Sequence, residues 1–310
     1  MKIRSLLLTS FFIVAFMLTG CNGNQQTATP DNAQVSPGDP EIIETVSVPI
    51  PTSTLEPTPA EPMAAMINGE RIWLSDFEAE IQRFMDAANN LEKEIDADQA
   101  KDIVLDTMVE TILLAQGARA SGFILDQETY LKKYDQLVIN SGGEDLFQQW
   151  LTDNHYTQES FEHIYRLQIE AVWMRDTILS QVPVCAEQIR ARQILVSSKT
   201  LAEDIYKQLQ NGVDFEYYSW GYDLLSGGEL GWFPRDYLIL PQIEAAVFNL
   251  QPGDYTEVIE STYGYHIVQV MERELDRLLT QDALIQKQRI AIEAWLTDQK
   301  KKSTVILEQN

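Results

Sequence analysis

Residues 187–272 constrain the fold of this 310-residue chain more than any other stretch of the sequence. Three blocks within it are short apolar runs or alternate apolar with polar residues beside a turn signal, which is typical of β-strands. The three blocks are residues 190–196, 227–233 and 263–268. Between them, residues 200–210 show helical spacing before Gly212, and residues 241–250 begin with proline and precede Gly253. This order of strands and helices predicts a compact α+β domain of about 85 residues.

The amino-acid sequence of these blocks resembles that of the parvulin family of peptidyl-prolyl isomerases. The chain has Gln-Ile-Leu-Val in the first strand, Gly-Gly-Glu-Leu-Gly-Trp-Phe in the second block and Gly-Tyr-His-Ile-Val in the last. The resemblance covers roughly a quarter of the chain. It implies a parvulin-like domain at residues 185–273, with a small antiparallel sheet, that catalyses cis-trans isomerisation of X–Pro bonds without a cofactor.

The resemblance also implies which residues form a polar catalytic floor. His266 matches the family's C-terminal histidine, and Gln193 stands where the family has its first-strand histidine. A glutamine can donate and accept hydrogen bonds but cannot titrate. Asp223 is the acid nearest the Gly227–Gly228 turn, in a shortened loop, and is the candidate for the family's acid or cysteine. The alternative role for His266 is to orient strands through hydrogen bonds.

An apolar cradle for the proline ring is implied by the same family. The expected substrate-binding residues are Leu195, Leu230, Leu238 or Ile239, Ile243, Phe248 and Ser261. The alternative is that the apolar members are ordinary core residues. The three histidines form no cluster with metal-ligand spacing, and no glycine run has the context of a phosphate loop. We therefore expect neither a metal nor a cofactor.

The N-terminus reads as a secretory signal. Lys2 and Arg4 precede a short apolar run at residues 6–18, which predicts a signal peptide at residues 1–20 rather than a membrane span. The following Leu-Thr-Gly-Cys sequence looks like a bacterial lipobox, which implies lipidation of Cys21. An ordinary signal peptide with an incidental cysteine is the alternative. With Cys21 lipidated, Cys185 has no partner, so no internal disulfide is expected.

Residues 21–62 are expected to form a disordered tether. Eight of the twelve prolines lie between residues 22 and 62, with six acidic residues and no Lys or Arg. Such a composition cannot bury a core. The whole chain has a net charge of −24, which argues against nucleic acid and against anionic lipid headgroups as partners. The acidic surface either keeps the protein soluble or favours cationic clients.

Residues 63–184 predict a helical domain that begins with a hairpin around Asn68-Gly69. Ser75 and Glu78 have the spacing of a capping box. Helices are expected at residues 75–90, 98–121, from Asp126 to the glycines 142–143, at 144–153 and at 157–181. This layout is similar to the N-terminal chaperone domain of extracytoplasmic foldases of the PrsA and SurA type. In those proteins the C-terminal segment, here a helix expected within residues 274–310, returns to complete a discontinuous domain.

The sequence thus predicts a foldase anchored by lipid at the extracytoplasmic face of a bacterial membrane. Its expected partners are unfolded or nascent secreted polypeptides that contain proline. One alternative is a non-catalytic chaperone whose altered parvulin domain only binds peptide. A solute-binding lipoprotein is a third possibility, but it needs two lobes of parallel strands that the helix-rich first half does not supply.

Overall fold

The computed structural model describes residues 62–307, which form two compact units. Within the described residues, the first unit comprises 62–109, 124–166 and 304–307, and the second comprises 110–123 and 167–303. The predicted signal peptide, nearly all of the predicted tether and Cys21 lie outside the described residues. Among the described helices, none combines the length and apolar character that a membrane span requires.

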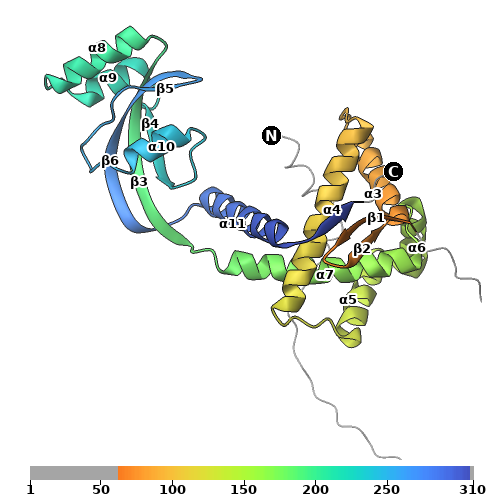
Figure 1. The fold of residues 1–310 in the computed structure, drawn as a ribbon. Helices are drawn as coiled ribbons and strands as arrows, with labels where there is room; N and C mark the ends of the chain where they lie inside the picture. The colour runs from red at the N-terminus through yellow and green to blue at the C-terminus, as the bar shows by residue number, and fades with distance from the viewer. Residues whose placement is uncertain (1–61, 308–310) are drawn as a thin grey trace, which may run out of the picture. The chain divides into compact units, whose positions relative to one another are not determined.

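The first unit contains a three-stranded antiparallel sheet in the order β2-β1-β7. The strands are β1 (Met63–Ile67), β2 (Glu70–Trp73) and β7 (Val305–Leu307). The predicted hairpin is present, and β7 pairs with β1 along its other edge. Asn68, in the turn between β1 and β2, binds Thr304, which directly precedes β7. Its N–H donates to Thr304 O at 3.0 Å and its Oδ1 accepts from Thr304 N at 2.9 Å. The C-terminal strand therefore belongs to the N-terminal sheet (Figure 1).

Helices make up the rest of the first unit. They are α3 (Leu74–Asn90), α5 (Gln127–Asn140), α6 (Glu144–Asp153) and the first parts of α4 (Ala97–Ala120) and α7 (Gln158–Ser180). Asp126 caps α5 as predicted, since its Oδ1 accepts from Thr129 N at 2.7 Å. The predicted capping box of α3 is wrong: the helix already begins at Leu74 and its N-cap is Trp73, so Ser75 lies within the first turn.

An aromatic core joins α5, α6 and α7. Phe147 and Phe161 meet edge to face with ring centroids 5.4 Å apart, and Trp150 contacts both rings. The guanidinium of Arg83, on α3, lies 3.9 Å from the centre of the Tyr156 ring and donates to Asn154 O. Edge-to-face pairs and cation–π contacts add to the energy of simple burial, so these rings fix the helices to one another.

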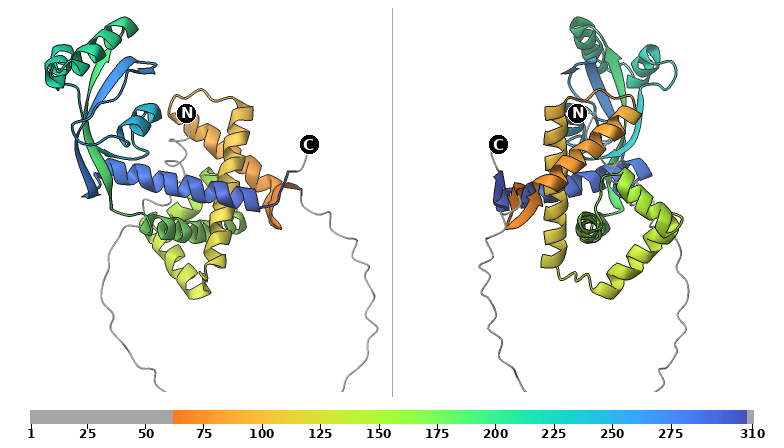
Figure 2. Two further views of the ribbon diagram at one scale, coloured as in Figure 1. Left: turned by 60° about the vertical axis from the view of Figure 1, so that its left-hand side comes forward. Right: turned by 90° about the vertical axis from the view of Figure 1, so that its right-hand side faces the viewer.

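The second unit is built on a four-stranded antiparallel sheet in the order β4-β3-β6-β5. The strands are β3 (Cys185–Val196), β4 (Glu229–Pro234), β5 (Ile259–Ser261) and β6 (Gly264–Leu278). Helices α8 (Lys199–Gln210) and α9 (Phe215–Tyr222) cover one face, and α10 (Pro241–Val247) covers the other (Figures 1 and 2). The small antiparallel sheet of the expected α+β domain is therefore present.

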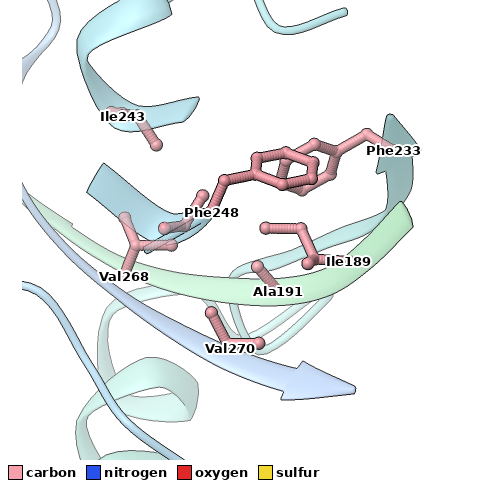
Figure 3. Packing of buried hydrophobic residues seen from close by; sticks show 8 residues of the cluster. Ile189, Ala191, Phe233, Ile243, Phe248, Val268 and Val270 are labelled. Atoms are coloured by element: carbon pink, nitrogen blue, oxygen red, sulfur yellow. The ribbon is translucent and has the colours of Figure 1, made fainter. Parts of the chain in front are cut away.

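Each face of this sheet has its own hydrophobic core. Successive residues of a strand point to opposite faces, and Ile267 joins the core under α8 and α9 while Val268 joins the core under α10. Figure 3 shows the second core, with Ile243 and Phe248 lying over the side chains of β3 and β6. The Phe248 ring meets Phe233 edge to face, with centroids 6.1 Å apart.

Helix α11 (Gln281–Lys302) follows β6 within the second unit. Its Trp295 packs in a cluster with Ala118 of α4 and Met174 of α7, and Lys300 pairs with Glu110 of α4 at 2.8 Å. The C-terminal helix thus contacts the C-terminal halves of α4 and α7. Because the compact units divide α4 and α7, the expected domain boundaries at residues 62, 184 and 273 remain predictions.

Candidate active site

His266 lies in the middle of the sheet of the second unit. It pairs with Leu195 of β3 on one side and with Ile259 of β5 on the other, and its side chain is only 2% exposed. Residues directly opposite each other in an antiparallel pair project from the same face. Gln193, which pairs with Val268, therefore lies on the same face as Leu195 and His266. This is the face that carries the α10 core.

A chain of hydrogen bonds fixes the imidazole of His266. Its Nδ1 lies 2.8 Å from Gln193 Oε1 and its Nε2 lies 2.6 Å from Ser261 Oγ. Because an amide oxygen only accepts, Nδ1 carries the ring proton and Nε2 accepts from the Ser261 hydroxyl. Ser261 Oγ in turn accepts from Tyr263 N at 3.0 Å. Both ring nitrogens of a neutral His266 therefore have hydrogen-bond partners.

We expect His266 to titrate below the ordinary histidine range. Burial lowers the pKa of His266 below 6.5 because desolvation disfavours the imidazolium. The unfolded chain therefore binds more protons between that lowered pKa and about 6.5, so the stability that neutral His266 contributes is complete above this window and is lost as the pH falls through it. An NMR titration of the ring should give a pKa below 6.5. A value at or above 6.5 would contradict the neutral network.

The predicted cradle residues divide into buried and accessible members. Ile243 and Phe248 are buried in the α10 core, as ordinary core residues would be. Leu230 and Leu238 are partly buried and pack against that core. Each is therefore held in place by the core and still leaves apolar surface accessible. Of the two alternatives at one position, Leu238 joins the core whereas Ile239 is 87% exposed.

Leu195 is 37% exposed beside the imidazole that it pairs with. The structure thus brings together Gln193, His266 and Ser261 in one network, with Leu195 on the same face. An apolar surface next to a neutral, hydrogen-bonded floor can accept an uncharged ring without leaving a buried charge unpaired.

Asp223 has a different set of contacts from the other predicted catalytic residues. It ends α9, and its carboxylate accepts hydrogen bonds from Leu225 N, Ser226 N, Ser226 Oγ and Gly228 N. These bonds, the Ser226 hydroxyl first, lower the pKa of Asp223 to about 2. Its hydrogen bonds therefore go to its own loop rather than to the imidazole.

Two residues that are not among the predicted site residues, Gly228 and Glu244, bind backbone groups next to the site. Gly228 O accepts from Gln193 N at 2.8 Å, and a Cβ at position 228 would lie 1.9 Å from Gln193 O. The Glu244 carboxylate accepts from the backbone N–H groups of Asp236, Tyr237 and Leu238 at 2.5–3.1 Å. Gly228 belongs to the turn signal at Gly227–Gly228. Nothing in the local sequence indicates that Glu244 is buried beside the loop at residues 236–238.

Several proteins of known name are similar in sequence to this chain. The Foldase protein PrsA of Caldanaerobacter subterraneus is 26% identical over 239 residues, which is 66% of this chain and 72% of that protein. The PrsA of Bacillus subtilis is 36% identical over 89 residues, and Chaperone SurA of Bordetella parapertussis is 34% identical over 139. The matched regions cover 30% of the former and 26% of the latter. The crystal structure of PrsA from Bacillus anthracis aligns with 64% of this chain and 96% of its own, at 23% identity and a TM-score of 0.40.

Family models assign most of the described residues. The model of the PPIC-type PPIase domain matches residues 185–272, which contain Gln193, Ser261 and His266. The model of the SurA-like N-terminal domain matches residues 51–172. The chain therefore carries a parvulin-type peptidyl-prolyl isomerase domain together with a SurA-like N-terminal domain.

Proposed function

We propose that the chain is an extracytoplasmic foldase that binds unfolded polypeptides and isomerises their X–Pro bonds at the face that carries His266. The observation that carries this proposal is the chain of hydrogen bonds from Gln193 through His266 to Ser261. It lies on the same sheet face as the α10 core. Leu195, Leu230 and Leu238 offer the apolar surface for the proline ring, and we keep Ile239, Ile243 and Phe248 as further candidates from the family resemblance.

The geometry suits a reaction that needs no nucleophile. Rotation about an X–Pro bond faces a barrier of about 20 kcal/mol because the planar amide is stabilised by resonance. As the bond twists, resonance is lost and the amide oxygen carries less negative charge. A dry apolar surface therefore favours the twisted form over the planar one. A neutral His266 adds a fixed polar group at that surface without adding a charge.

Gln193 preserves the network although it cannot titrate. Its Oε1 accepts the Nδ1 proton of His266, so the ring keeps one orientation and one tautomer. This observation favours a working site over the alternative of a retired domain that only binds peptide. Catalysis that depends on orientation and desolvation requires no proton transfer from position 193.

We also propose that lipid attaches the chain to a membrane and that its clients are unfolded polypeptides. The lipobox at Cys21 and the proline-rich segment that follows support a lipid-anchored protein with reach from a membrane. The relatives named foldase and chaperone support unfolded polypeptides as the clients. The net charge of −24 argues against nucleic acid as a partner.

Refolding of a paired set of clients tests this function with the full chain. One client refolds through a slow phase set by isomerisation at a native trans-proline, and the other is the same protein with that proline replaced by alanine. A foldase should suppress aggregation of both clients and accelerate only the slow phase of the first. Aggregation suppression without acceleration would establish the non-catalytic alternative, and neither effect would contradict the proposal.

A further inference from the structure

The loop at residues 223–228 connects α9 to β4 and contacts β3 at Gln193. Gly228 meets Gln193 closely enough that no side-chain atom fits between them, and its carbonyl accepts the Gln193 N–H. Gly227 also lies close to a neighbour, because a Cβ there would lie 2.7 Å from the Trp220 ring. The path of this loop therefore limits where Gln193 can lie on the side of β3 that faces Gly228.

Asp223 fixes the path of this loop. Its Oδ1 accepts from Leu225 N at 3.0 Å and from Ser226 N at 3.1 Å. Its Oδ2 accepts from Ser226 Oγ at 2.5 Å and from Gly228 N at 3.2 Å. Charge-assisted hydrogen bonds of this kind are stronger than neutral ones. Both oxygens of the carboxylate are thus occupied by loop donors.

We propose that Asp223 is a positioning residue that holds Gln193 in register with His266 through Gly228. A continuous set of hydrogen bonds connects the four residues: Asp223 Oδ2 to Gly228 N, Gly228 O to Gln193 N, and Gln193 Oε1 to His266 Nδ1. Asp223 acts on the imidazole only through these intermediates. The catalytic consequence of this role rests on the proposed isomerase function, whereas its structural part does not.

The substitution Asp223→Asn removes one link in this series. The amide keeps an oxygen that can accept from the Leu225 and Ser226 N–H groups, but its NH₂ group cannot accept from Gly228 N. Asp223→Ala removes every hydrogen bond that the Asp223 carboxylate accepts from the loop. A matched control is Asp214→Ala, which removes the N-cap of the same helix, where Asp214 Oδ1 accepts from Glu216 N. The control tests whether any loss of stability in α9 is enough to disturb the site.

The experiment records NMR signals of the full-length protein, together with its isomerisation rate on a short X–Pro peptide. In Asp223→Asn, hydrogen exchange at the Gln193 amide should rise by at least about tenfold, and the His266 Nδ1 proton should broaden or vanish. The isomerisation rate should fall by about fivefold to tenfold. Asp223→Ala should show larger changes of the same kind, and Asp214→Ala should leave the signals and the rate unchanged.

Unchanged Gln193 and His266 signals in Asp223→Asn would overturn the proposal. If the rate also fell in that case, Asp223 would act directly on substrate. Equal changes in Asp214→Ala would overturn the proposal as well, because they would show a general effect of α9. If the wild-type chain does not isomerise the peptide, the proposed function fails, while the NMR signals still decide whether Asp223 positions Gln193.

Discussion

Alanine in place of Gly228 is expected to destabilise the isomerase domain by about 2–4 kcal/mol and to separate Gln193 from His266. The new Cβ would lie 1.9 Å from Gln193 O and 3.0 Å from Gln193 C, and these are backbone atoms that cannot rotate away. The backbone at Gly228 also has a φ of +73°, which strains any residue with a Cβ. Native-state hydrogen exchange at the amides of β3 and β6 reports the stability of this domain by itself.

Gly231→Ala provides the matched control for this prediction. Gly231 lies on β4 with a φ of +72°, nearly the same as Gly228, but a Cβ there would meet no atom within 4 Å. The control therefore carries the backbone strain, about 1–2 kcal/mol, without the collision. An equal loss of stability in the two variants would show that the close approach of Gly228 to β3 does not matter.

Local patterns predicted most of the secondary structure. The Asn68-Gly69 turn, the Asp126 cap and helix α6 at Glu144–Asp153 all lie where the sequence placed them. Each depends on residues within a few positions of one another, so a single segment contains all the necessary information. The predicted start of α3 is wrong although the pattern is local. Ser75 and Glu78 have the spacing of a capping box, but the helix already begins at Leu74.

The full length of β6 could not be predicted from its own residues. The expected strand ended at Val268, whereas β6 continues to Leu278 through a run that includes Glu272, Glu274 and Asp276. This extension exists because β3 begins at Cys185 and supplies pairing partners as far as Leu278. The pairing joins residues about 90 positions apart, and no local pattern reveals it.

The candidate site divides in the same way. Residues within sequence motifs could be predicted, whereas contacts that depend on the course of a loop could not. Gln193 and His266 were located by their motifs, and the structure joins them directly. The partners of Asp223 and the choice between Leu238 and Ile239 depend on loops whose course is set by Gly228 and Glu244. A buried carboxylate that binds three backbone N–H groups looks, in the sequence, like any acid in the first turn of a helix.

Removal of the His266 imidazole is expected to lower catalysed isomerisation by at least about tenfold. The substitution His266→Ala leaves Gln193 Oε1 and the Ser261 hydroxyl without their shared partner and opens a void beside Leu195. Water can then reach the surface that must stay dry for the twisted amide to be favoured. The variant should also lose about 2–3 kcal/mol of domain stability, so it is studied where hydrogen exchange shows the domain to be folded.

The most direct measurement is exchange NMR on a short peptide with one X–Pro bond, using the full wild-type chain, His266→Ala and the control His163→Ala. His163 is an exposed histidine on α7 and lies outside the isomerase domain. We expect rapid cis-trans exchange with the wild type and with His163→Ala, and a loss of that exchange with His266→Ala. Absence of exchange with a folded wild-type chain, or full activity in His266→Ala, would contradict the claim that this network forms an isomerase site.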